Sequence, residues 1–170
     1  MKLKDIKPNP ELIVLIGLPG VGKSYIINDI IHNNPQQKYH IASTDNIIDA
    51  IAKEQGKTYS DVFQSEFKNA NKTMQNNVAE AIANRESVIW DQTNMASGKR
   101  KGIIQRFPRD YKKIAVVVTS EPTIHAERLK KRAETEGKHI PQHILDDMAS
   151  RYEEPSKSEG FDEIKFIENN

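Results

Sequence analysis

A short apolar run that leads directly into a glycine-rich loop and then into a helix constrains this chain more than any other feature. Leu12–Ile16 has the character of a buried strand, and Gly17–Ser24 reads Gly-Leu-Pro-Gly-Val-Gly-Lys-Ser. Apolar residues at helical spacing begin at Tyr25. Because a strand, a glycine loop and a helix in this order open a βα unit, the chain is predicted to have an α/β fold.

The rest of the chain repeats the same alternation of short β-branched runs and longer segments with helical spacing. The predicted strands are Leu12–Ile16, Tyr39–Ala42, Ser87–Trp90, Ile114–Val118 and Glu163–Ile167. The predicted helices are Tyr25–His32, Asn46–Gln55, Ser60–Asn84, Ala96–Gln105, Thr123–Ala133 and Gln142–Tyr152. Because Ile114–Val118 is apolar at every position, this strand is expected to be covered on both faces. These features predict a doubly wound, five-stranded parallel sheet.

The longest predicted helix carries one apolar stripe that is expected to face the sheet, because its members recur at steps of mostly three and four. The stripe consists of Phe63, Phe67, Ala70, Met74, Val78, Ala81 and Ile82. Ser60 is the expected N-cap of this helix. Pro141 suits the start of the last helix, and Pro155–Gly160 is predicted to be a turn-rich link to the last strand.

Length and composition limit the classes of protein that remain. The 170 residues fit a single domain, predicted over residues 1–170 with residues 1–10 as a loosely held arm. With 25 basic and 24 acidic residues, any contact with nucleic acid requires a local patch. The longest apolar run is far shorter than the ~20 residues of a membrane span. The polar N-terminus and the lack of cysteine lead us to expect a cytoplasmic protein without a membrane partner.

The loop Gly17–Ser24 has the composition and the context of a phosphate-binding P-loop. Backbone N–H groups of such a turn converge on phosphate oxygens, and glycine permits the close approach. Lys23 is expected to neutralise the β- and γ-phosphates of ATP, and the Ser24 hydroxyl to ligate Mg²⁺. The loop residues expected to hold the nucleotide are Gly17, Leu18, Pro19, Gly20, Val21, Gly22, Lys23 and Ser24.

Two aspartates directly follow predicted strands, where ligands of parallel α/β sheets bind. Asp91 follows Ser87–Trp90 and is the expected Mg²⁺-binding carboxylate; the alternative is an Asx-turn that leaves the strand. Asp45 follows Tyr39–Ala42 and is the candidate base that accepts a proton from a substrate hydroxyl. The alternative for Asp45 is a helix N-cap, and the two roles do not exclude each other.

Arginines four positions apart predict a cationic lid over the phosphates. Arg128 and Arg132 share one face of a predicted helix, and the lid is expected over residues 128–141. Cations that arrive as water is excluded stabilise the charge on a transferring phosphoryl group, so both arginines are assigned catalytic roles. A second basic group comprises Lys99-Arg100-Lys101, Arg106 and Arg109. The sequence does not separate solubilising residues from contacts to a substrate phosphate in this group.

With these residues in place, the chain resembles the P-loop kinases of the polynucleotide 5'-hydroxyl kinase group, over nearly its whole length. Ser43-Thr44-Asp45 stands where that group has Asn-Arg-Asp, and Asp91-Gln92-Thr93-Asn94 is similar to its Asp-Asn-Thr-Asn strand end. Further similar segments are His139-Ile140-Pro141, Tyr152-Glu153-Glu154-Pro155 and Glu159-Gly160-Phe161. The resemblance implies Asp45 as general base, Asp91 with Thr93 and Asn94 beside the phosphates, and Arg128 and Arg132 in the lid.

The chain also departs from that group. Thr44 and Ile48 occupy positions where phage-type polynucleotide kinases carry arginines that grip the phosphate next to the reacting hydroxyl. This difference implies retained catalysis with an altered grip on the polynucleotide. Asp91-Gln92-Thr93-Asn94 and Glu136-Gly137-Lys138 also look like the P-loop domain of heterogeneous nuclear ribonucleoprotein U-like proteins.

Together these features predict a P-loop kinase that moves the γ-phosphate of Mg·ATP to a hydroxyl, most simply a nucleic-acid 5'-hydroxyl end. A hydroxymethylated DNA base or a small-metabolite hydroxyl is the alternative acceptor. An ATP-binding scaffold without phosphoryl transfer is the alternative of another class.

Overall fold

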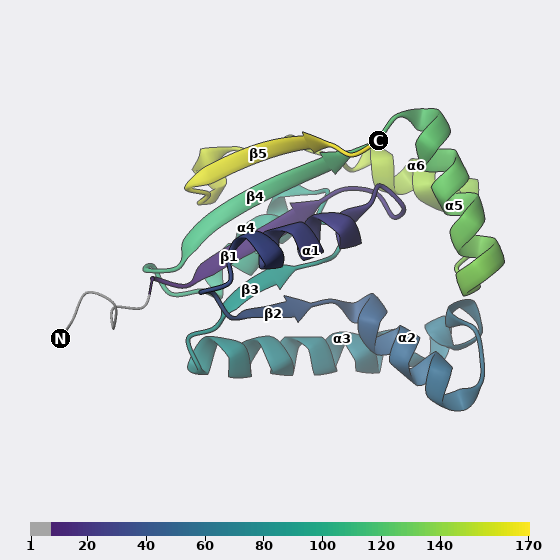
Figure 1. Ribbon diagram of the computed structural model, residues 1–170, viewed down its shortest axis with the longest axis horizontal. Helices are drawn as coiled ribbons and strands as arrows, with labels where there is room; N and C mark the ends of the chain where they lie inside the picture. Colours follow the sequence, from purple (N-terminus) through teal and green to yellow (C-terminus); the bar gives the residue numbers. More distant parts are fainter. Residues whose placement is uncertain (1–7) are drawn as a thin grey trace.

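A computed structural model describes residues 8–170 and contains a five-stranded, all-parallel sheet in the order β2-β3-β1-β4-β5 (Figure 1). The strands are β1 (Glu11–Ile16), β2 (Tyr39–Ala42), β3 (Ser87–Trp90), β4 (Lys112–Thr119) and β5 (Glu163–Glu168). The helices are α1 (Lys23–Asn33), α2 (Thr44–Gln55), α3 (Tyr59–Ala83), α4 (Ser97–Gln105), α5 (Pro122–Glu136), α6 (Gln142–Ser150) and the short 3₁₀ helix η2 (Lys157–Glu159). The predicted fold class is confirmed, with all five strands at their predicted positions.

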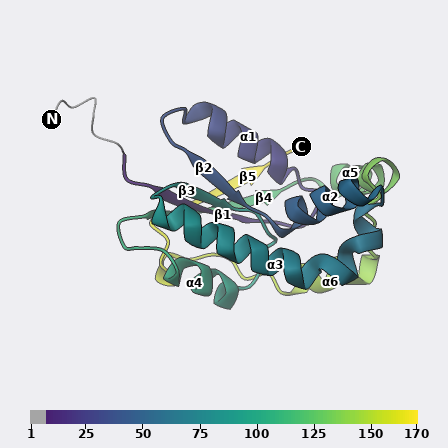
Figure 2. The same cartoon turned by 90° about the horizontal axis from the view of Figure 1, so that it is seen from below.

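Strand β1 lies at the centre of the sheet, in parallel register with β3 through Leu12 and Val88 and with β4 through Ile13 and Ile114. Its alternate side chains enter two separate apolar clusters. Leu12 belongs to the cluster that includes α3 and α4 residues, whereas Ile13 belongs to the cluster that includes α1 residues. Figure 2 shows α1 on one face of the sheet and α3 and α4 on the other. Burial on both faces explains the continuous apolar runs within the central strands.

The predicted apolar stripe of α3 meets the sheet only along part of its length. Met74 and Val78 are almost fully buried, whereas Phe63 is 36% and Phe67 45% exposed. The 25 residues of α3 span about 37 Å, far more than a four-residue strand. The helix therefore continues past the sheet beside α2 (Figure 1), where Val62 rather than Phe63 is buried. The expectation that both phenylalanines face the sheet is wrong.

The start of α3 also differs from the prediction. The N-cap is Thr58, whose side chain accepts a hydrogen bond from the Asp61 N–H at 3.2 Å. The Asp61 carboxylate accepts one from the Thr58 N–H in return, which completes a capping box. Ser60 is therefore inside the helix, where its hydroxyl donates to the Gly137 carbonyl at 2.7 Å.

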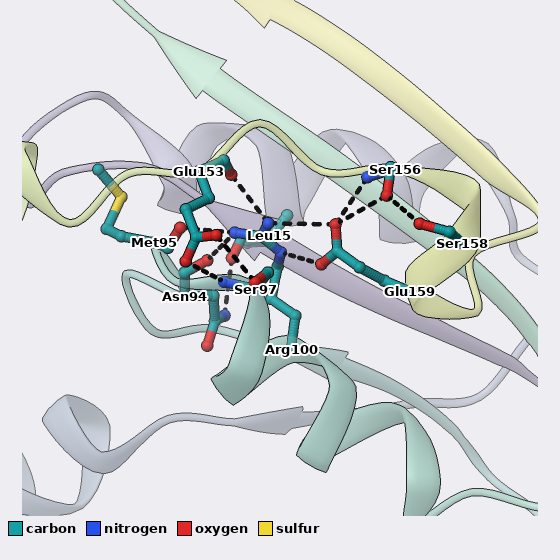
Figure 3. Close-up of polar contacts among 9 residues, drawn as sticks. All are labelled: Leu15, Asn94, Met95, Ser97, Arg100, Glu153, Ser156, Ser158 and Glu159. Carbon is teal, nitrogen blue, oxygen red and sulfur yellow. Dashed lines mark hydrogen bonds and ion pairs between the residues drawn. The ribbon is translucent and has the colours of Figure 1, made fainter.

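A buried arginine on α4 fixes the loop that follows β3 (Figure 3). The Arg100 guanidinium is fully buried and donates to the carbonyls of Asn94, Met95 and Glu153 at 2.6–2.9 Å. Its Nε lies 2.7 Å from the buried Glu159 carboxylate in η2, within the predicted turn-rich link. Arg100 is thus neither a solubilising residue nor a phosphate contact; it joins the β3–α4 loop to the C-terminal segment.

The predicted loose arm falls mostly on residues 1–7, which lie outside the described residues. At its end, the Asn9 carbonyl accepts a hydrogen bond from Gln37 and the Pro10 carbonyl one from the Lys112 N–H, so these two residues are tied down. Within residues 8–170, no helix has both the length and the apolar character that crossing a bilayer requires.

Candidate active site

A cavity of about 610 Å³ lies beyond the carboxyl ends of the strands, between the glycine loop, the start of α2 and α5. It brings together most of the residues singled out in the sequence. Those that line it are Pro19, Gly20, Gly22, Lys23, Ser24, Asp45, Asp91, Thr93, Arg128 and Arg132. Residues from four separate segments of the chain therefore face one space.

The glycine loop turns tightly enough to expose the N-terminus of α1. Gly22 is the N-cap of α1 and has φ 94°, a conformation that L side chains rarely adopt. A Cβ at Gly17 would lie 2.7 Å from the Val118 carbonyl oxygen, so the loop starts in contact with β4. Leu18 and Val21 pack into the apolar clusters. The free N–H groups of the first turn of α1 consequently lie beside the cavity, as an anion site requires.

Lys23 is the cation of this loop. Its Nζ donates to the Gly17 carbonyl at 2.9 Å and to the Gln92 carbonyl at 3.4 Å. Burial lowers the pKa of Lys23, although the charges of Asp91 and Asp45 act in the opposite direction. A desolvated ammonium held only by carbonyls gains strongly from a bound anion, so this environment suits a phosphate.

Asp91 and Ser24 supply oxygen atoms to the same cavity. The pKa of Asp91 is raised, chiefly by burial and also by the charge of Asp45, while Lys23 opposes the shift. A nearby divalent cation would relieve this buried carboxylate. Mg²⁺ is commonly held by one carboxylate together with substrate phosphates, and the two side chains fit that arrangement. Among residues 8–170, no group of three or more histidine, aspartate or glutamate side chains is placed to hold a metal ion.

Asp45 lies in the first turn of α2, with its side chain exposed to the cavity. The N-cap of α2 is Ser43, whose hydroxyl accepts from the Asn46 N–H at 3.2 Å, so the alternative assignment of Asp45 as the cap is wrong. The Tyr59 hydroxyl donates to Asp45 Oδ1 at 2.6 Å. Burial and the Asp45 charge raise the pKa of Tyr59, which therefore remains a donor at neutral pH. No spacing pattern in the sequence identifies this tyrosine as a partner of Asp45.

Both predicted lid arginines lie on α5 and line the cavity. Arg128 Nη1 donates to the Val21 carbonyl at 3.1 Å and to the Asn169 carbonyl at 2.6 Å, so it joins the glycine loop to the end of β5. Arg132 pairs more loosely with Glu136, at 3.9 Å. None of the α5 side chains is buried, which distinguishes this helix from the helices packed on the sheet.

The end of the lid segment contacts α2 and α3. Lys138 lines the cavity, lies 2.7 Å from the Asp49 carboxylate and stands 5.2 Å above the centre of the Tyr59 ring. Together with the hydrogen bond from Ser60 to Gly137, these contacts form what we call the lid latch: Asp49, Tyr59, Ser60, Gly137 and Lys138. The sequence places Lys138 in the lid without showing that it faces the cavity.

Thr93 and Asn94 separate in the structure. Thr93 lines the cavity, and its carbonyl accepts from the Gly17 N–H at 3.1 Å. Asn94 is fully buried with φ 50°, and its amide donates to the Leu15 carbonyl at 2.7 Å. The expectation that Asn94 stands beside the phosphates is therefore not met: its side chain orders the strand end instead.

Comparison with known proteins identifies a family and relatives of this chain. A family model described as an AAA domain matches residues 12–155. The chain is 24% identical over 164 residues to human heterogeneous nuclear ribonucleoprotein U-like protein 2, a match that covers 93% of this chain and 21% of that protein. The chain thus spans about a fifth of the length of the curated relatives it matches.

Solved structures share the fold at low sequence identity. The PezAT toxin-antitoxin system of Streptococcus pneumoniae aligns with a TM-score of 0.68 at 16% identity, covering 98% of this chain and 72% of that one. The Pnkp1/Rnl/Hen1 RNA repair complex aligns with 0.64 at 20% identity, covering 89% and 46%. A fungal RNA kinase aligns with 0.58 at 18% identity, covering 97% and 77%. Solved kinase structures such as the fungal RNA kinase share the fold of this chain, which is the P-loop kinase fold. Because the family model matches most of the chain, the chain belongs to the AAA-domain family.

Proposed function

We propose that the protein is an ATP-dependent phosphotransferase whose acceptor is a hydroxyl group, most simply the 5'-hydroxyl end of a nucleic acid. The observation that carries this proposal is the position of Asp45, an exposed carboxylate on the same cavity as Lys23 and the lid arginines. A site that only binds ATP has no need of a carboxylate at this place.

Different residues around the cavity have separate roles in the proposed reaction. Asp45 accepts the proton of the acceptor hydroxyl as its oxygen bonds to the γ-phosphorus, while the bond from that phosphorus to the β-γ bridging oxygen breaks and ADP leaves. Lys23 and Arg132 stabilise the negative charge on the transferring group. Mg²⁺ held by Ser24 and Asp91 would neutralise phosphate charge when bound. Tyr59 holds the Asp45 carboxylate in place through its hydrogen bond.

A nucleic-acid acceptor is supported by the sequence resemblance and by the fold shared with an RNA repair complex and an RNA kinase. Thr44 and Ile48 are 3% and 0% exposed, so these positions offer the acceptor no side chain to grip. Any phosphate contacts to the acceptor must come from other cations. We therefore expect the oligonucleotide affinity to fall with salt at a shallow log–log slope of roughly −1 to −3.

The test compares Asp45→Asn with the unchanged chain, using labelled ATP and a panel of 5'-hydroxyl oligonucleotides, hydroxymethylated DNA and nucleosides. Because Asn keeps the side-chain volume but lacks the base, transfer should fall by roughly 10² or more while ATP affinity persists. Asp29→Asn, at an exposed position of α1, is the matched control. Equal turnover in Asp45→Asn would remove the proposed role of this carboxylate.

A second function is ATP binding without transfer, the alternative of another class that the sequence leaves open. The same panel separates the two. Tight Mg·ATP binding without a phosphorylated product from any acceptor would support the scaffold, whereas transfer to a modified base or metabolite alone would identify the other acceptor class.

A further inference from the structure

A second cavity, of about 450 Å³, lies between α3 and α4 and shares a wall with the candidate active site. We call it the α3–α4 groove and define it by Phe67, Gln75, Trp90, Gln92, Lys99 and Arg106. Figure 2 shows these two helices side by side on one face of the sheet. Neither the nucleotide site nor the mechanism above uses this groove.

Gln92 connects the groove to the phosphate site. Its side-chain oxygen accepts from Trp90 Nε1 at 3.0 Å on the groove floor, and its Nε2 donates to the Thr44 hydroxyl at 2.8 Å. The Gln92 carbonyl accepts from Lys23 Nζ at 3.4 Å. Gln92 also lines both cavities, so a chain lying in the groove would have its end at the edge of the candidate active site.

The groove is positively charged. Lys99 and Arg106 line it, and no carboxylate is among the described residues that do so. The Arg106 guanidinium lies 5.6 Å above the centre of the Trp90 ring and is hydrogen-bonded to Gln75. Desolvation, together with the nearby charge of Lys23, lowers the pKa of Lys99 to about 8. Because the chain carries a formal charge of only +1, this positive character is local.

A row of aromatic rings runs from the groove toward the candidate base. Tyr59, Phe63 and Phe67 are spaced four residues apart on α3, with ring centres 5.5 and 5.2 Å apart. The row starts at the Tyr59 hydroxyl bound to Asp45 and ends at the exposed ring of Phe67. Exposed aromatic rings beside cations are the two elements with which proteins hold single-stranded nucleic acid: bases stack on the rings, and backbone phosphates pair with the cations.

We propose that the α3–α4 groove, together with the Phe63 ring beside it, binds the single-stranded 5' segment of a nucleic-acid acceptor, with bases stacked on Phe67 and Phe63 and backbone phosphates paired with Lys99 and Arg106. This assignment rests on the proposed function, since it leads the 5'-hydroxyl past Gln92 to Asp45. It also separates the basic residues that the sequence leaves together: Lys99 and Arg106 contact the substrate, whereas Arg100 is structural.

The experiment measures two quantities for a single-stranded oligonucleotide of about eight nucleotides with a free 5'-hydroxyl and a 3' fluorophore. Fluorescence anisotropy without ATP gives its dissociation constant, and labelled ATP gives KM and kcat for transfer. Phe67→Ala should raise both the dissociation constant and KM by about ten-fold and leave kcat and Mg·ATP affinity unchanged. Lys99→Gln and Arg106→Gln should each reduce the salt slope of binding by about 0.7.

Two matched controls use residues outside the groove. Phe166→Ala removes an exposed phenylalanine from β5, at the other edge of the sheet. Lys101→Gln removes an exposed cation two positions from Lys99, hence from another face of α4. Both controls should bind and phosphorylate the oligonucleotide like the unchanged chain.

The outcomes separate the groove from the reaction. One outcome is that the groove variants lose oligonucleotide binding while the protein without substitutions transfers no phosphate from ATP to any 5'-hydroxyl. This outcome would support the groove and overturn the proposed function. Normal binding and KM in all three groove variants, with transfer intact, would overturn the groove and keep the function. If the protein without substitutions binds no oligonucleotide, the groove assignment is overturned. This outcome covers the case in which the groove binds a protein partner instead.

Discussion

Among single side chains, Lys23 has the environment most specific to a nucleotide. Its ammonium is partly desolvated and held by two carbonyl oxygens, so phosphate is the partner that compensates its charge. Lys23→Ala should weaken Mg·ATP binding or turnover by orders of magnitude and leave the fold intact. Titration calorimetry with Mg·ATP measures the first effect, and circular dichroism checks the second. An unchanged calorimetric affinity would remove the P-loop assignment.

Arg100 and Glu159 form a buried ion pair, with side chains 0% and 3% exposed. Removing one partner of such a pair leaves an uncompensated buried charge, so Glu159→Gln should lower the free energy of unfolding by about 3 kcal/mol at neutral pH. Urea unfolding of the variant and the unchanged chain measures the difference. Glu154→Gln, at an exposed position, serves as the control and should change stability little.

The same pair predicts a pH dependence. Burial alone would raise the pKa of Glu159, but the hydrogen bonds from Arg100 and from the Ser156 N–H outweigh it and lower the pKa below 4.5. A carboxyl whose pKa is lower in the folded state stabilises the fold above its unfolded pKa and ceases to do so as the pH falls. The difference in stability between the unchanged chain and Glu159→Gln should therefore shrink below about pH 4.5. A difference that stays constant down to pH 2 would contradict this account.

Among the helices, α5 has no buried side chain and is held by polar contacts, from Arg128 to the glycine loop and from the lid latch at its C-terminal end. The lid latch holds its C-terminal end through Ser60 and Lys138. Ser60→Ala with Lys138→Gln should reduce the protection of the Thr135–His139 amides in hydrogen exchange, by a free energy of about 1 kcal/mol for each lost hydrogen bond. Lys130→Gln, an exposed cation on the same helix, is the control. Unchanged protection would show that α5 holds its position without the latch.

The elements themselves were largely predictable, whereas their partners were not. The central strands were predictable because burial on both faces leaves a continuous apolar run, as in Ile114–Val118. Periodicity does not reveal how far a helix extends past the sheet, which is why the apolar stripe wrongly predicts that Phe67 faces the sheet. The Tyr59–Asp45 contact and the structural role of Arg100 depend on long-range packing, which local spacing does not reveal.

At the scale of the whole molecule, cations and helix N-termini lie together around the candidate active site, at one end of the sheet. A nucleotide bound there should therefore stabilise the entire fold. At a free Mg·ATP concentration of 100 times the dissociation constant, the gain is about 2.7 kcal/mol. Thermal unfolding with and without Mg·ATP should show a corresponding rise in Tm. Adenosine with Mg²⁺, which lacks the phosphates, should give no such rise; an equal rise would place the binding energy elsewhere than on the glycine loop.

Trp90 gives the molecule an optical reporter at a useful place. It is the single tryptophan of the chain, is 1% exposed, and lies under Arg106 and beside Gln92, where the groove meets the phosphate site. A ligand that moves the guanidinium off the indole ring or breaks the Nε1 hydrogen bond changes the surroundings of this chromophore. Its emission can therefore follow occupancy of either cavity in the unmodified protein, with stopped-flow time resolution and without an attached dye.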